Sequence, residues 1–122
     1  MKAKIQSPRE LGLEGEEIAK VYLKKKGFKI LAEGFRTSRK EIDIIASQGD
    51  VIVFVEVKAR RKSQFGFPEE AVDRAKQEKI KTAASAWLGR QPFKFRECRF
   101  DVISLIFNSE KDYEIRHLED AF

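Results

Sequence analysis

The chain has 122 residues and carries 25 Lys and Arg residues against 20 Asp and Glu residues, a formal net charge of +5. Hydrophobic residues make up 42% of the chain, which excludes wholesale disorder. The longest apolar run, Val51–Val55, is far shorter than the ~20 residues needed to span a bilayer. The single cysteine excludes an intramolecular disulfide, and the basic N-terminus is not followed by the apolar stretch of a signal peptide. We therefore expect a cytoplasmic protein with no membrane segment.

The charge is unevenly distributed along the chain. Residues 1–100 contain 23 basic and 14 acidic side chains, whereas residues 101–122 contain 2 basic and 6 acidic ones. A basic body with an acidic tail favours a polyanionic partner such as nucleic acid. The alternative is a protein that is basic without such a partner.

No repeat, low-complexity tract or linker divides the sequence, so we predict a single domain over residues 1–122. Ser7, Pro8 and Glu10 form a helix-start signal, and Gly27 marks the end of a helix over about residues 8–26. A second helix is predicted over about 73–88, after a basic loop at 60–68. Hydrophobic patterning predicts strands over 28–31, 41–46, 51–59, 99–107 and, at the edge, 113–118. This α-β-β-β-α-β order with a terminal strand indicates an α/β sandwich with a mixed central sheet.

The second and third predicted strands are expected to form a hairpin. A turn over Ser47–Asp50 would place Asp43 opposite Phe54 and Glu41 opposite Glu56. The sequence therefore predicts that acidic residues gather at the end of the hairpin remote from its turn.

In this register, alternation places five side chains on one face: Glu41, Asp43, Phe54, Glu56 and Lys58. Three carboxylates and one ammonium leave two surplus negative charges, and like charges ~4 Å apart repel by about 4 kcal/mol at an effective dielectric of 20. One interpretation is a solvent-facing ladder of ion pairs. The other is a divalent cation, for which oxygen-only ligands favour Mg²⁺ or Mn²⁺.

An acid followed by Glu-x-Lys across a hairpin is the pattern of the PD-(D/E)xK nuclease superfamily. A closer resemblance is carried by an ordered set of segments at 15–16, 41–43, 54–60, 71–73, 86–88 and 99–102. Together they resemble the YraN family of small bacterial proteins, which is assigned to that superfamily and is similar to archaeal Holliday-junction resolvases. The resemblance covers nearly the whole chain, with Lys40 standing where relatives often have Gly before Glu-Ile-Asp. It implies a restriction-endonuclease-like fold.

The resemblance also implies a phosphodiesterase site that depends on Mg²⁺ or Mn²⁺. By their match to the motif, Asp43, Glu56 and the backbone carbonyl of Val57 would hold the metal ion. Lys58 would orient the attacking water or neutralise developing charge.

Glu16 resembles the helix glutamate that completes the resolvase site. It shares a helical line with apolar Ala19 and Leu23, which favours an inward orientation. The alternative is a surface ion pair with Lys20, worth only ~0.3–0.5 kcal/mol. Glu41 is a further candidate, behind the ligands or on a second metal ion.

The basic segment after the third strand is the predicted nucleic-acid contact, because Arg60, Arg61 and Lys62 can hold phosphates that flank the site. Phe65 and Phe67 follow, and we favour a role in covering the core over base stacking. His117, the only histidine, is predicted to be structural.

These observations favour a metal-dependent nuclease that acts on nucleic acid, with DNA the expected substrate and repair or recombination the expected setting. Cutting a junction requires two sites, which favours a homodimer. The rival interpretation is a non-catalytic nucleic-acid-binding module that keeps the nuclease fold. All four of the site residues Glu16, Asp43, Glu56 and Lys58 are present, and a decayed site would be expected to lose them.

Overall fold

We analysed a computed structural model of the chain, which describes residues 7–37, 40–62, 72–109 and 111–122. Its first helix, α1 (Pro8–Lys25), begins as the sequence predicts. The Ser7 side chain accepts the Glu10 N–H and the Glu10 carboxylate accepts the Ser7 N–H, so the capping box is complete. Neither of the described helices has the length and hydropathy required to span a membrane.

Five strands form a single sheet in the order β1-β2-β3-β4-β5. The β3–β4 pair is parallel and the other three neighbouring pairs are antiparallel. The strands are β1 (Lys29–Arg36), β2 (Glu41–Gln48), β3 (Val51–Arg61), β4 (Glu97–Phe107) and β5 (Tyr113–Leu118). Between β3 and β4 runs the helix α3 (Arg74–Leu88). The predicted α/β class with a mixed central sheet is confirmed, and the arrangement is consistent with a restriction-endonuclease-like fold.

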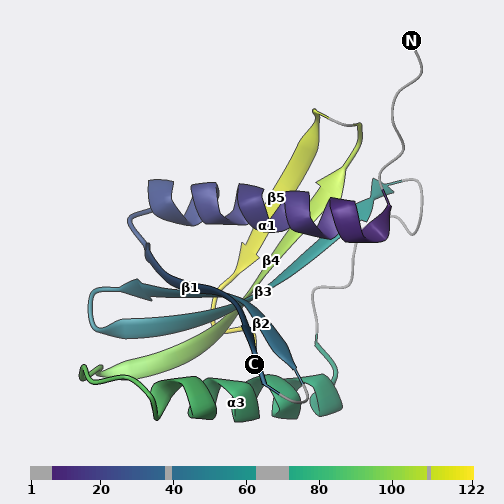
Figure 1. Cartoon of the computed structure of the whole chain (residues 1–122). Helices are drawn as coiled ribbons and strands as arrows, with labels where there is room; N and C mark the ends of the chain where they lie inside the picture. The colour runs from purple at the N-terminus through teal and green to yellow at the C-terminus, as the bar shows by residue number, and fades with distance from the viewer. Residues whose placement is uncertain (1–6, 38–39, 63–71, 110) are drawn as a thin grey trace.

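The two helices cover opposite faces of the sheet (Figure 1). The hydrophobic cluster beneath α1 includes Leu11, Ala19, Leu23, Ile44, Val53, Val55 and Ile103. The cluster beneath α3 includes Ile42, Ile45, Phe54, Ile80, Trp87 and Val102. Strand β3 contributes to both clusters, as expected for a central strand that is buried on both faces.

The prediction that residues 60–68 form a loop is wrong at its start. Arg60 and Arg61 belong to β3 and pair with Ile106 and Phe107 of β4. Parallel pairing with β4 extends β3 beyond its apolar segment, which is why hydrophobicity alone ended the strand too early. The predicted roles of Phe65 and Phe67 lie outside the described residues.

The predicted register of the β2–β3 hairpin is also wrong, by two residues. Gln48 pairs with Val51, so the loop consists of only Gly49 and Asp50, and the pairing continues to Ile44–Val55. A two-residue loop is the commonest hairpin connection. With the shorter loop, Asp43 lies across from the part of β3 near Glu56 and not across from Phe54.

Candidate metal centre

Helix α1 reaches the sheet at Gly15, which places the next residue, Glu16, at the edge of the β2–β3 hairpin. A Cβ on Gly15 would lie 2.9 Å from the Ala59 Cβ, closer than real Cβ atoms approach one another. Only glycine therefore lets the helix lie this close to β3. The sequence predicts an inward Glu16, and the structure places it half-buried and facing β2.

The alternation of side chains along β2 is interrupted at Asp43. Ile42 packs in the cluster under α3, whereas Ile44, two residues later, packs under α1. On the neighbouring strand β1, Gly34 lies between the partners of these two isoleucines and has a φ of +57°. Glycine adopts this positive φ at little cost, and it occurs where the alternation of side chains along β2 is interrupted.

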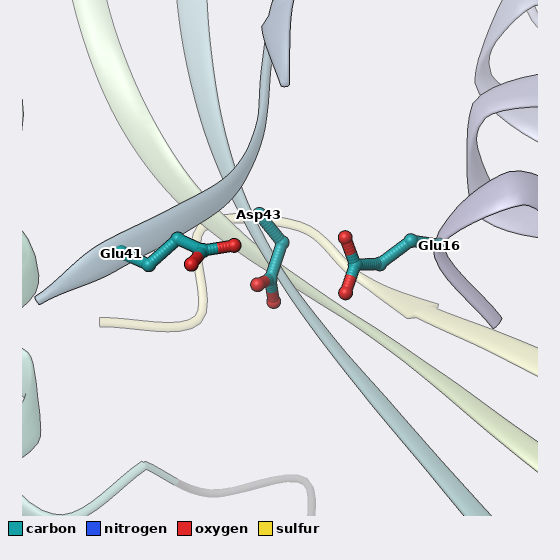
Figure 2. A group of neighbouring side chains, drawn as sticks. All are labelled: Glu16, Glu41 and Asp43. Carbon is teal, nitrogen blue, oxygen red and sulfur yellow. The ribbon is translucent and has the colours of Figure 1, made fainter. Parts of the chain in front are cut away.

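Three carboxylates meet as a result. Oxygen atoms of Glu16, Glu41 and Asp43 all lie within 4.8 Å of one another, and the three side chains point towards a common centre (Figure 2). All three residues are half-buried. We call this set the acidic triad, and it contains one carboxylate from α1 and two from β2.

The electrostatics of the acidic triad disfavour three charged groups. Burial, then the neighbouring charge of Glu56, raises the pKa of Asp43 to about 7, although the Val57 N–H donates to Asp43 Oδ2 over 2.8 Å. Burial, followed by the charges of Glu41 and Glu56, also raises the pKa of Glu16. A bound cation would reduce the repulsion among these carboxylates and favour their charged forms.

Glu56, a predicted metal ligand, is held outside the acidic triad. Its side chain is 6% exposed, and its Oε1 lies 2.8 Å from Lys76 Nζ of α3 and 3.6 Å from Lys40 Nζ. The expectation that the five side chains from Glu41 to Lys58 named for this hairpin share one face is therefore wrong. Phe54 and Glu56 face α3, whereas the triad lies on the side of α1. The difference arises because the alternation of side chains along β2 is interrupted at Asp43.

The remaining predicted site residues lie along β3. The backbone of Val57 supplies the N–H that orients Asp43, and Lys58 is half-buried opposite Ser104 of β4. Arg60 and Arg61 are half-buried at the end of the same strand, and Lys62 is exposed immediately after it. The predicted phosphate contacts therefore continue the strand that carries Glu56 and Lys58.

The alternative partner for Glu16, an ion pair with Lys20, is not formed. Lys20 pairs instead with Glu17 and, over 2.6 Å, with Glu33 of β1. Its charge still lowers the pKa of Glu16, but less than burial and the neighbouring carboxylates raise it.

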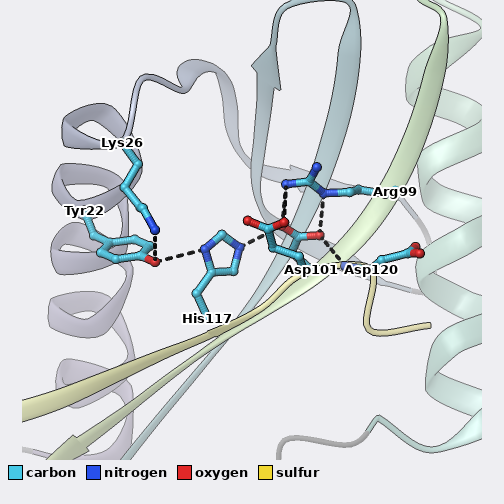
Figure 3. Close-up of polar contacts among 7 residues, drawn as sticks. Tyr22, Lys26, Arg99, Asp101, His117 and Asp120 are labelled. Atoms are coloured by element: carbon cyan, nitrogen blue, oxygen red, sulfur yellow. Dashed lines mark hydrogen bonds and ion pairs between the residues drawn. The ribbon is translucent and has the colours of Figure 1, made fainter.

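A second polar cluster ties β4 and β5 to α1 through a chain of hydrogen bonds and ion pairs (Figure 3). The fully buried Asp101 accepts hydrogen bonds from Arg99 Nε and the Asp120 N–H, each over 3.0 Å, and its Oδ2 lies 2.7 Å from His117 Nε2. Burial opposes ionisation of Asp101, but these hydrogen bonds outweigh it and lower the pKa. His117 Nδ1 lies 3.1 Å from the Tyr22 hydroxyl. His117 thus occupies a buried structural network.

Comparisons with known proteins identify the family. Residues 15–105 match the model of the family described as "Uncharacterised protein family UPF0102". A UPF0102 protein of Syntrophomonas wolfei subsp. wolfei is 48% identical over 114 residues, which are 93% of this chain and 98% of the relative. One from Dictyoglomus thermophilum is 42% identical, with coverage of 93% and 98%. One from Chlorobaculum tepidum is 42% identical, with coverage of 97% and 95%.

This chain belongs to the UPF0102 family. Its match extends from Gly15, where α1 meets β3, to Leu105 in β4, and so includes every member of the acidic triad. The triad offers only carboxylate oxygens, which are donors that suit a hard divalent cation. These residues could therefore hold a metal ion in this UPF0102 protein.

Sequence reasoning missed Lys76 and Lys40, the two cations that hold Glu56. One local signal was available for Lys76. Asp73 is the N-cap of α3. Lys76 lies three positions later, where a capping box has Glu or Gln. A lysine there marks a departure from helix preference. Lys40 stood out only as a departure from the family pattern, and its contact with Glu56 depends on the fold.

Proposed function

We propose that this UPF0102 chain is a metal-dependent nuclease that hydrolyses phosphodiester bonds in nucleic acid. The observation that carries the proposal is the acidic triad, in which carboxylate oxygens of Glu16 from α1 and of Glu41 and Asp43 from β2 lie within 4.8 Å of one another. The fold and the resemblance of the motif segments to PD-(D/E)xK nucleases support it. The basic body, with its surplus of Lys and Arg, supports a polyanionic substrate.

The site residues are assigned roles by chemistry. The triad would hold Mg²⁺ or Mn²⁺, with Glu56 and the Val57 carbonyl as further predicted ligands. A bound cation of this kind supplies Lewis acidity and lowers the pKa of water. The Val57 N–H fixes the orientation of Asp43 before any ligand binds. Lys58, on the same strand, would neutralise charge that develops on the phosphate.

The substrate would be held by the residues that extend β3. Lys58 is followed closely along the chain by Arg60, Arg61 and Lys62. These basic side chains would contact the phosphates that flank the scissile bond. We favour DNA as substrate and the cytoplasm as location. A homodimer would supply the two sites that a junction requires.

The test is an incubation of the purified chain with branched, duplex and single-stranded DNA and with RNA, in the presence of Mn²⁺ or EDTA. Cleavage that needs Mn²⁺ and is lost in Asp43→Asn supports the proposal. Equal cleavage by the parent and Asp43→Asn would indicate a contaminating nuclease. No cleavage of any substrate would contradict catalysis.

The second candidate is a binding module that keeps the nuclease fold without activity. It is favoured by one observation, that Glu56 is paired with Lys76 and Lys40 rather than joined to the acidic triad. This candidate predicts nucleic-acid binding that does not change when Mn²⁺ is added or when Asp43 is replaced by Asn.

A further inference from the structure

The first turn of α3 carries a lysine where helices favour an acid. Asp73 is the N-cap and its Oδ1 accepts the Lys76 N–H over 2.8 Å, yet no residue of that turn is acidic. In α1 the equivalent position is Glu10, which completes a capping box. An ammonium group near a helix N-terminus opposes the helix dipole. Residues that break such local preferences in natural proteins often serve function.

Within the part of the chain that the structure describes, the ammonium group of Lys76 pairs with the Glu56 carboxylate. The two groups are 2.8 Å apart, and the Lys76 side chain is 36% exposed while that of Glu56 is 6% exposed. A carboxylate buried to this degree requires a cation or hydrogen-bond donors. Lys40, at 3.6 Å from the same oxygen, assists. Glu56 is therefore held by Lys76 of α3 and is not a member of the acidic triad.

The charge of Glu56 nevertheless acts on the triad, since it is one of the causes that raise the pKa of Asp43. A cation held by the triad would attract the same carboxylate. A divalent cation and the Lys76 ammonium group would then compete for Glu56.

We propose that Lys76 is a positioning residue, which orients Glu56 in the metal-free protein and competes with a divalent cation for its carboxylate. This inference rests on the proposed function. When Glu56 turns towards the cation, the ammonium group of Lys76 loses its partner and becomes a contact for an anionic substrate such as a phosphate group.

The experiment measures the Mn²⁺ affinity of the full chain by titration calorimetry. Lys76→Met removes the competitor, so Mn²⁺ should bind at least about threefold more tightly than to the parent. Lys76→Arg keeps the positive charge and should remain within about twofold of the parent. Lys79→Met is the matched control, because it removes the same charge from an exposed position of the same helix. It should also leave the affinity within about twofold.

A second arm repeats Lys76→Met in a Glu56→Gln background. Lys76→Met alone leaves the buried Glu56 carboxylate without its lysine and could destabilise the protein, whereas the double variant has no such carboxylate. There the lysine should have nothing to compete for, and its removal should leave Mn²⁺ affinity unchanged. Equal affinities of Lys76→Met and Lys79→Met, or an effect of Lys76→Met that persists beside Glu56→Gln, would overturn the inference alone. Absence of Mn²⁺ binding by the parent would overturn the proposed function and this inference with it.

Discussion

The carboxylate of Asp43 accepts a hydrogen bond from the backbone N–H of Val57, with 2.8 Å between Oδ2 and N. The paired part of the β2–β3 hairpin runs as far as Ile44–Val55, so this side chain bonds to the backbone of β3 just beyond it. The bond fixes Asp43 at the point where α1 approaches the sheet. The carboxylate is thereby oriented before any ligand arrives.

The pKa of Asp43 predicts how stability depends on pH in the absence of metal. The folded-state pKa is about 7, whereas an aspartate in an unfolded chain titrates near 4. Between these values only the folded protein keeps the proton. The free energy of unfolding should therefore fall as pH rises from about 4 to 7, by up to about 1.4 kcal/mol per pH unit from this group, and then level off.

Urea denaturation in EDTA at pH 5 and pH 8 checks this dependence. Asp43→Asn cannot ionise and keeps an acceptor for the Val57 N–H, so it should lose much less stability between the two pH values than the parent. Glu114→Gln, at an exposed position of β5, is the control and should behave as the parent does. Identical pH dependence in the parent and Asp43→Asn would show that Asp43 ionises normally.

The close approach of α1 to β3 predicts opposite effects for two glycines of the same helix. Gly15→Ala places a Cβ 2.9 Å from the Ala59 Cβ and should destabilise the protein by about 1–3 kcal/mol. Gly12→Ala meets no atom within 4 Å and should stabilise it by about 0.5–1 kcal/mol through helix propensity. Equal stabilisation by both substitutions, in urea denaturation, would contradict the packing of α1.

Asp101 is predicted to serve stability and not metal binding. Asp101→Asn breaks the ion pair between the fully buried Asp101 and the partly exposed Arg99 and should cost about 3–5 kcal/mol, while the Mn²⁺-induced rise in Tm is retained. Since the pKa of Asp101 is lowered, its contribution is present above the unfolded pKa and is lost as pH falls through the folded value. Asp112→Asn, an exposed control, should have little effect. Loss of the Mn²⁺ response in Asp101→Asn would contradict this assignment.

The salt dependence of nucleic-acid binding tests the basic end of β3. On duplex DNA, log affinity should fall linearly with log salt, by about 0.9 for each phosphate neutralised. Replacing Arg60, Arg61 and Lys62 together by Ala should flatten this slope. The matched control replaces the three exposed lysines at 24–26, near the end of α1, and should leave the slope unchanged. An unchanged slope in the first variant would place the binding surface elsewhere.

Local sequence signals predicted most of the fold. Ser7 and Glu10 located the start of α1, and the β-branched run from Val51 identified the central strand. Hydrophobic patterning did not decide the register of the hairpin, because loops of two and of four residues leave each side chain on the same face of the sheet and change only its cross-strand partner. The preference of hairpins for two-residue loops favours the observed register.

The candidate site was predicted in its residues but not in its partners. Asp43, Glu56 and Lys58 stand out by spacing, and Glu16 by its helical line. The triad contains Glu41 and not Glu56 because the alternation of side chains along β2 is interrupted at Asp43. Gly34, on the neighbouring strand β1, has a positive φ at this level of the sheet. This interruption depends on how neighbouring strands pack, and it breaks the alternation of side chains on which the prediction depended.

The most direct test of a cation site in the acidic triad is a thermal scan of three proteins with and without millimolar Mn²⁺. The parent should gain Tm, since Mn²⁺ would bind only the folded state and relieve the repulsion among the carboxylates. Asp43→Asn should be at least as stable as the parent without metal and should not respond to Mn²⁺. Lys58→Ala keeps the triad and should retain the shift. A parent whose Tm does not change with Mn²⁺ would contradict the metal centre and the nuclease proposal built on it.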